Sequence, residues 1–434
     1  MSGPSPARAA ERAVAQRAEQ SGAREIGATW LKALITPLSR PWVAGLTALT
    51  VYLLRALVSP QGMDATQYAY YNYLADAFLH GQLGLRVLPP QLLDLLVYHD
   101  QVYLYWPPFP VLLLMPLVAI FGYAASDVAF AVVLGAATIA LLAKVLAAFD
   151  RTGLAPLTAA RRGILVATCA FGTFLLFLVP TGRVWYTGQV IGWGCILLVT
   201  LAALNLRGAR GYFLVALALA CAMATRMPLI FNGLWLGYYL LRRDWHQPRL
   251  AQARAIGAGL VPVVVTLLLL GWYNWARFGS PLDTGLAWQQ VGGIWRDDLA
   301  RWGQFNLHYL PKNLYYHFIA YPLFPARRWY GGGLFWMTPV LFGAWWGLWQ
   351  ARRNPFTWVL VASCVLLYAP SGLLIGTGWV TFGPRYILDL LVPLLLLTAI
   401  GIRQWRLDLL QLLMCISCLT YLAGSALWLF EYQV

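Results

Sequence analysis

Long apolar runs separated by short polar loops dominate the chain after residue 40. The first run, PWVAGLTALTVYLLRALVSP, begins at about residue 41, and later runs centre near residues 115, 138, 170, 197, 219, 234, 264, 342, 365, 393 and 419. A helix of about 20 apolar residues crosses a bilayer. The run near residue 115, PPFPVLLLMPLVAIFGY, is short and interrupted by prolines, which predicts a re-entrant or half-length element. We therefore predict an all-α membrane protein, a polytopic helical bundle with roughly eleven full spans plus this short element.

Composition agrees with a membrane protein. Of the 434 residues, 60% are hydrophobic and only 11% are charged, whereas about a quarter of the residues in a soluble domain are charged. The formal net charge of +15 comes almost entirely from arginine, so a nucleic-acid-binding protein is the obvious rival. The arginines form short clusters between apolar runs and no single basic face, so we expect a lipid bilayer as partner and no nucleic acid.

Five loops are basic, namely residues 150–162, 207–210, 242–254, 351–354 and 403–406. Cytoplasmic loops of membrane proteins are enriched in Lys and Arg. We expect all five on the cytoplasmic side, together with residues 1–40, a basic tail predicted to be disordered. This arrangement requires that the short run near residue 115 does not cross. Residues 41–434 then form one polytopic transmembrane domain.

The same topology gathers the unusual polar segments on the opposite, outer face. They are residues 60–105, 181–189, 225–228, 273–333 and 376–386. In the long outer loop, 273–333, Trp295, Leu299, Trp302 and Tyr309 recur at helical spacing, which predicts an amphipathic helix in the outer interface. We expect an outer cavity rich in arginine and aromatic residues.

The stretch MDATQYAYYNYLADAFLHGQL, residues 63–83, carries the first candidate chemistry. As a helix beginning at Asp64, it places Tyr68 and Tyr71 on the same face as the Asp64 carboxylate. Asp64 is also a candidate N-cap, with Gln67 completing a capping box and the tyrosines acting as interfacial anchors. The two roles do not exclude each other.

Glycosyl transfer from a lipid phosphate would need one carboxylate and several arginines at the outer face, which is what the sequence places there. The chain has neither GxGxxG nor a P-loop signature, so a donor for an outer site must arrive on a lipid carrier. The leaving phosphate needs no protonation, so a single carboxylate suffices as general base. We predict Asp64 as that base, with Asp100 and Asp94 in reserve.

Arginine binds phosphate oxygens in pairs through its planar fork. The predicted lipid-phosphate ligands on the outer face are Arg385, Arg226, Arg183, Arg277 and Lys312. The alternative for each is an interfacial anchor, since long basic side chains snorkel to the headgroups. The predicted cavity lining is Tyr68, Tyr71, His99, Tyr105, Trp106 and Tyr386.

A metal centre is not expected. The histidines have neither HxxxH nor HExxH spacing, and the six cysteines lie inside apolar runs, as packing residues do. We expect no cofactor apart from the lipid-linked donor, which is a substrate.

Four segments together resemble a known family: MDATQYAYYNYLADAFLHGQLGL, DQVYLYWPPFPVLLLMPLVAIFG, NWARFGSPLDTG and FGPRYILDLLVPLLLL. The chain resembles bacterial multi-pass glycosyltransferases of the GT-C fold, relatives of the dolichyl-phosphate-mannose protein mannosyltransferases and of the aminoarabinose and lipopolysaccharide-core sugar transferases. The resemblance implies a bacterial inner-membrane enzyme that moves a sugar from a polyprenyl phosphate to a glycan, lipid or protein hydroxyl. It also implies a catalytic acid in the first outer loop, where Asp64 stands. The protein mannosyltransferases have Asp-Glu there, and this chain has Asp-Ala.

The alternative from another class is a secondary transporter or lipid flippase, which would also have many spans and intramembrane arginines. Transporters are typically built from inverted repeats with broken helices at the midplane. Here the polar residues lie in long outer loops, which favours catalysis at the outer surface.

Overall fold

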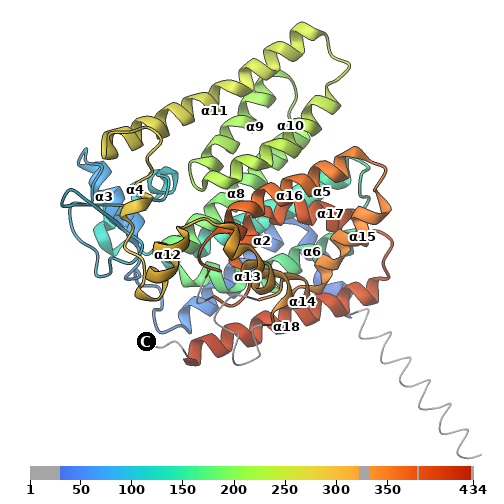
Figure 1. Cartoon of the computed structure of the whole chain (residues 1–434). Helices are drawn as coiled ribbons and strands as arrows, with labels where there is room; N and C mark the ends of the chain where they lie inside the picture. The colour runs from blue at the N-terminus through green and yellow to red at the C-terminus, as the bar shows by residue number, and fades with distance from the viewer. Residues whose placement is uncertain (1–29, 322–331, 379–380, 432–434) are drawn as a thin grey trace, which may run out of the picture.

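The computed structural model describes residues 30–321, 332–378 and 381–431. Helices make up nearly all of the regular structure in these ranges, and the strands β1 (Leu96–Tyr98) and β2 (Gln101–Tyr103) form one antiparallel hairpin (Figure 1). The all-α prediction is confirmed. Of the predicted tail, residues 1–29 lie outside the described residues, as do residues 322–331 of the long outer loop. The prediction of disorder is wrong for residues 30–39, which are helical and end in η1 (Thr36–Ser39), with Ile35 and Leu38 buried against the bundle.

Apolar length explains most of the helices. Six described helical segments are long and apolar enough to cross a membrane, and a seventh results if one pair bent by 46° counts as a single span. The six are α5 (Asp127–Asp150), α8 (Val184–Asn205), α11 (Arg249–Phe278), α16 (Pro355–Leu373), η11 with α17 (Arg385–Leu390 and Leu391–Ile402), and α18 (Leu407–Glu431). The bent pair is α6 (Ala159–Phe171) with α7 and η3 (Leu175–Leu178 and Val179–Thr181).

The remaining helices are shorter. They are α2 (Pro41–Leu57), α3 (Tyr70–Leu79), α4 (Phe109–Phe121), α9 (Gly208–Met223), α10 (Asn232–Arg243), α12 (Arg296–Trp302), α13 (Leu310–Leu314), α14 (Leu334–Met337) and α15 (Gly343–Gln350). The predicted number of roughly eleven spans therefore includes segments that are shorter than a full crossing or broken into two helices.

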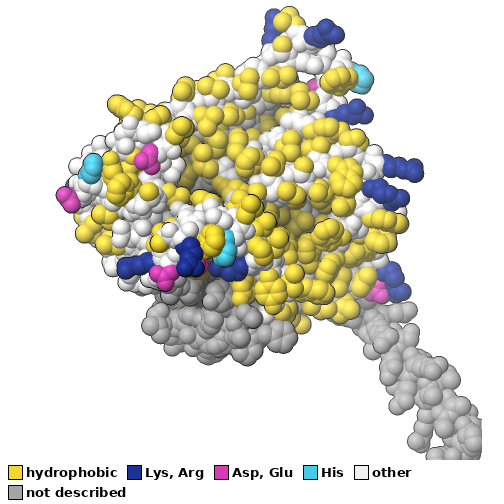
Figure 2. Space-filling view, in the orientation of Figure 1, with side chains coloured by type: hydrophobic (Ala, Val, Ile, Leu, Met, Phe, Trp, Pro, Cys, Tyr) yellow, Lys and Arg dark blue, Asp and Glu magenta, His cyan; other side chains and the backbone are white. Residues whose placement is uncertain are grey.

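The basic loops meet at one end of the bundle, which we call the basic end. Arg161 donates to the Trp405 carbonyl at 2.8 Å, Arg151 to Asn205 at 3.1 Å, and Arg243 to the Ala203 carbonyl at 2.6 Å. These bonds join loop 150–162 to loop 403–406, and they join loops 150–162 and 242–254 to the end of α8, just before loop 207–210. Gln350 beside loop 351–354 donates to Gln404. Lys and Arg side chains accordingly follow the right-hand edge of the molecule in Figure 2. The expectation that these loops share one face agrees with this arrangement.

The polar loops 60–105, 181–189 and 376–386 meet at the opposite end, which we call the outer end. Both ends of α4 lie there. The amide of Phe109 donates to the Ala224 carbonyl just after α9, and the Asn72 side chain of α3 donates to the Ala125 carbonyl just after α4 at 2.7 Å. The chain therefore enters and leaves α4 at the same end, as predicted for the half-length element, and α5 then runs from Asp127 to the basic end.

The helix predicted to begin at Asp64 begins instead at Tyr70, and Ala69 is its N-cap residue. The reason is tertiary. The Thr66 amide and hydroxyl both donate to Asp127, at 2.9 and 2.6 Å, and the Val184 amide donates to the Tyr68 carbonyl at 3.1 Å. These bonds hold residues 64–69 in turns, so Asp64 does not cap α3.

The predicted interfacial helix is also interrupted. Helix α12 ends at Gly303, whose φ of 72° is left-handed and favours glycine. The Tyr309 hydroxyl then donates to the carbonyls of Asp298 and Gly303, at 3.1 and 2.8 Å. The chain is folded back on itself, and α13 and the π-turn η8 (Tyr315–Ile319) follow as separate pieces.

Candidate functional site

A half-buried carboxylate, Asp94, lies at the outer end just before β1. Trp185 donates to one of its oxygens at 2.9 Å, and Gln289 donates to the other at 3.0 Å. Its own amide donates to the Gln290 carbonyl at 2.9 Å, which joins the first outer loop to the long one. Burial raises the pKa of Asp94, while the bond from Trp185 and the charge of Arg385 lower it. The carboxylate is thus firmly held within the electrostatic reach of an arginine.

Arg385 begins η11 and supplies that charge. Its guanidinium carbon lies 5.4 Å from the Tyr186 ring centre and 4.9 Å from that of Tyr386, and Gln189 donates to its carbonyl at 3.0 Å. Within the described part of the chain no carboxylate forms an ion pair with Arg385, and its Nε is buried without a hydrogen-bond partner. A guanidinium held between aromatic rings, with donors to spare, is suited to an anionic ligand.

Arg226 is the other arginine that the sequence favoured for phosphate, and its situation differs. It lies between α9 and η4 (Met227–Phe231), and it donates twice to Asp389, Nε at 2.9 Å and Nη2 at 2.8 Å. The Asp389 side chain is only 2% exposed. This bidentate pair neutralises most of the Arg226 charge, so Arg226 contributes to the site mainly by fixing η11 against η4.

Aromatic rings form a wall beside Asp94. Tyr105 lies against Trp106 with ring centres 3.9 Å apart, Trp106 meets Trp185 edge to face at 6.2 Å, and Tyr68 lies 4.9 Å from Trp185. The structure thus brings four predicted cavity residues to this site: Tyr68, Tyr105, Trp106 and Tyr386. Trp185, Tyr186 and Gln289 were missed, although the first two stand in the outer segment 181–189, where adjacent aromatic residues were a usable signal.

Tyr71, in contrast, belongs to the packed interior. Its side chain is 2% exposed, and its hydroxyl has no hydrogen-bond partner in the described chain. That hydroxyl abuts Gly188 of α8, where an added Cβ would lie only 2.6 Å away. The glycine makes room for the phenol, so Tyr71 sets the spacing between α3 and α8 and does not line a cavity.

The three other predicted phosphate ligands are spread over the outer end. The Arg183 guanidinium lies 5.2 Å from the Tyr68 ring centre, and Lys312 lies 5.0 Å from that of Trp295. Arg277 is buried, and it donates to the carbonyls of Tyr273 and Leu104 at 3.1 and 2.8 Å. Because protein carbonyls occupy its donors, Arg277 serves as a clamp between α11 and the segment before α4.

Asp64 is exposed, in the turns between α2 and α3. The two-residue turn of the β1–β2 hairpin is His99-Asp100, with φ of 47° and 60°, as a type I′ turn requires. Both turn residues are exposed. Of the two reserve carboxylates, therefore, Asp94 and not Asp100 lies in the site.

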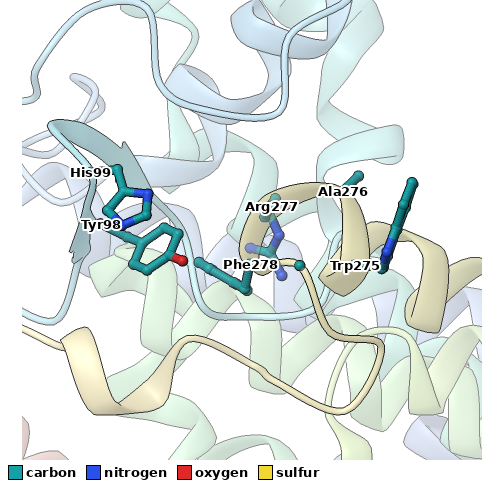
Figure 3. A pocket seen from close by; sticks show the side chains of 7 residues that line it. Tyr98, His99, Trp275, Ala276, Arg277 and Phe278 are labelled. Atoms are coloured by element: carbon teal, nitrogen blue, oxygen red, sulfur yellow. The ribbon is translucent and has the colours of Figure 1, made fainter.

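His99 instead lines a separate open cavity of about 520 Å³ between the hairpin and the end of α11 (Figure 3). Figure 3 shows His99 over Tyr98, facing Phe278 and Arg277 across the gap. The His99 and Tyr98 rings stack with centres 4.0 Å apart. No residue of the Asp94–Arg385 site lines this cavity.

Over the described residues no three or more His, Cys, Asp or Glu side chains gather as metal ligands would, and the six cysteines are free thiols.

No protein-family model matches the chain, and no curated protein matches its sequence. Among solved structures it is similar to the crystal structure of ArnT from Cupriavidus metallidurans bound to undecaprenyl phosphate, with 15% identity and a TM-score of 0.45. The similarity covers 84% of this chain but 60% of that one, so this chain matches less than two thirds of that protein. A likeness of this size does not by itself establish a shared activity.

Proposed function

We propose that this protein is a membrane glycosyltransferase that moves a sugar from a polyprenyl-phosphate carrier to an acceptor hydroxyl at the outer end. The observation that carries this proposal is Arg385, whose permanently charged guanidinium lies between two aromatic rings, within electrostatic reach of Asp94, with no ion pair to a described carboxylate. An arginine that only anchors the chain in the headgroups needs no aromatic cage, whereas this guanidinium is held with its Nε buried and unpaired. A guanidinium binds phosphate oxygens through two parallel hydrogen bonds.

The two carboxylates take different tasks in this proposal. In a direct displacement the acceptor hydroxyl attacks the anomeric carbon from the side opposite to the leaving phosphate. A general base for that hydroxyl must therefore lie away from the cation that holds the phosphate. Asp94 lies within electrostatic reach of Arg385, and both of its oxygens already accept hydrogen bonds. Asp64 is exposed and free to meet an incoming acceptor, so it is the proposed base.

Asp94 then acts on the donor. A carboxylate held by Trp185 and Gln289 retains lone pairs that accept hydrogen bonds from sugar hydroxyls. The neighbouring rings of Tyr105 and Trp106 offer apolar faces for a sugar ring or for the first prenyl units. Asp94 is thus proposed to select and orient the sugar while Arg385 holds the phosphate.

The test is release of polyprenyl phosphate by the purified protein from polyprenyl-phosphate sugars in the presence of an acceptor. Asp64→Asn should lower turnover by about 10²-fold or more, the scale for losing a general base, with donor binding retained. Asp94→Asn should mainly weaken donor binding. Near-native turnover of Asp64→Asn, with turnover lost and donor binding kept in Asp94→Asn, would move the base to Asp94.

The same assay separates this proposal from the flippase alternative. A flippase moves the lipid-linked sugar across the membrane and leaves the glycosyl phosphate bond intact. Release of free polyprenyl phosphate requires that bond to break. If the protein translocates the intact carrier between leaflets of a vesicle and releases no polyprenyl phosphate with any acceptor, the transferase proposal fails.

The orientation in a bacterial inner membrane is proposed from the charge bias of the loops, with the basic end in the cytoplasm and the site outside. A reporter fused at residue 248, in the α10–α11 loop, should report cytoplasm. An external signal there would reverse the orientation and put the proposed site on the cytoplasmic side.

A further inference from the structure

A second groove, of about 520 Å³, lies at the basic end, where the start of α2 meets the ends of α5 and α8. Three of its lining residues are polar: Lys144 from α5, Arg151 directly after α5, and Asn205 from α8. The rest of the lining is apolar and consists of Pro41, Ala147, Leu198, Leu201, Ala202 and Leu206. The groove therefore combines a hydrocarbon-like floor with two cations at its rim.

The two cations share one face of α5. Lys144 and Arg151 are seven residues apart, two helical turns or about 10 Å along the axis. Arg151 is the C-cap residue of α5, and its guanidinium donates to Asn205 of α8 at 3.1 Å across the groove. Asp150, the adjacent carboxylate in the chain, is engaged by Arg162. The described residues that line the groove include no acid, so its charge is uncompensated.

The position of Lys144 is energetically unfavourable for a charged side chain. It lies two turns inside the apolar helix α5 and is exposed, with no hydrogen bond or ion pair to a described residue. Side chains of a helix tilt toward its N-terminus, and the N-terminus of α5 is at the outer end. The Lys144 stem thus starts toward the membrane interior and must bend back to reach the headgroups. An anion at the groove would offset that cost.

We infer that this groove binds an anionic phospholipid from the leaflet at the basic end, its phosphate between Lys144 and Arg151 and one acyl chain over Leu198, Leu201 and Leu206. Basic pockets between transmembrane helices recognise anionic headgroups in this way. Arg40 and Arg207, both exposed, directly adjoin the lining residues Pro41 and Leu206 in the chain and add to the positive field. The inference does not depend on the proposed transferase activity.

The test is native mass spectrometry of the full chain titrated with phosphatidylglycerol, and with zwitterionic phosphatidylcholine for comparison. We expect a phosphatidylglycerol adduct whose affinity falls about thirtyfold in Lys144→Gln/Arg151→Gln, on the scale of one headgroup contact per lost cation. The pair Lys144→Arg/Arg151→Lys should restore it. Unchanged affinity in the glutamine variant would overturn the inference.

Two matched variants make the test specific. Arg352→Gln/Arg353→Gln removes two exposed arginines from the same end but outside the groove, and it should leave the affinity unchanged. An equal loss of affinity in this variant would mean that the lipid is attracted by the overall surface charge and that the groove is not a binding site. Ala202→Trp fills the groove and keeps both cations, so it should weaken lipid binding. If inorganic phosphate displaces the lipid and Ala202→Trp binds normally, the groove takes a free anion and the lipid assignment is wrong.

Discussion

The carboxylate of Asp127 holds together the loops that carry the proposed base and Arg183. Asp127 is the first residue of α5 and is 3% exposed. It accepts the Thr66 amide at 2.9 Å, the Thr66 hydroxyl at 2.6 Å and the Arg183 amide at 3.0 Å. Asp64 lies two residues before Thr66. Replacing Asp127 should therefore displace Asp64 without removing it.

Asp127→Asn turns one accepting oxygen into an amino group that faces a donor. A hydrogen bond to a charged group contributes about 1.5–3 kcal/mol, and the substitution breaks at least one. We expect the free energy of unfolding to fall by about 2–3 kcal/mol. The displaced Asp64 should also lower turnover by about tenfold or more, since a misplacement of about 1 Å is enough for such a loss.

Asp150→Asn is the matched control, because Asp150 is the last residue of the same helix. Its carboxylate accepts the Leu157 amide at 3.0 Å and the Arg162 guanidinium, far from the outer end. The cysteines are free thiols, so a thiol-reactive dye reports unfolding on heating. Both variants should melt lower, and only Asp127→Asn should lose turnover. Wild-type turnover in Asp127→Asn, or an equal loss in Asp150→Asn, would refute the positioning role.

The arginines of the outer end, a buried histidine and a close helix contact lead to three more predictions. Arg385→Lys should weaken donor binding and change the melting temperature little. Arg226→Lys should lower the melting temperature because it breaks the bidentate pair with Asp389. Equal effects of the two variants on donor binding and on melting temperature would contradict this. Burial lowers the pKa of His317 to about 4, so between about pH 6.5 and 4 only the unfolded chain gains a proton there. The melting temperature should fall across that window, less so in His317→Gln. Gly188→Ala should be destabilising, and adding Tyr71→Phe should restore the melting temperature, since the phenol oxygen that the new Cβ meets has no partner.

The phosphate residues show what the sequence could not decide. Arg385 directly follows Pro384 and Arg226 lies two residues before Pro228, each at the outer end of an apolar run, and neither local sequence shows whether the guanidinium is free. The difference is that Asp389 lies against Arg226, far away along the chain. The sequence likewise suggested that Arg277 could bind phosphate, but in the fold its guanidinium donates to the Leu104 carbonyl. Whether a buried guanidinium is free depends on partners that only tertiary contacts supply.

The sequence by itself determined the helical class, the apolar segments, the half-length element near residue 115 and the grouping of the basic loops. These are properties of run length and local charge, which a bilayer selects segment by segment. Only the tertiary structure decided where α3 begins, because two hydrogen bonds that Thr66 donates to Asp127 override the capping signal at Asp64. It also decided that Asp94 feels the charge of Arg385 while Asp100 lies in the exposed hairpin turn, because these placements join segments distant in sequence, which no periodicity or motif encodes.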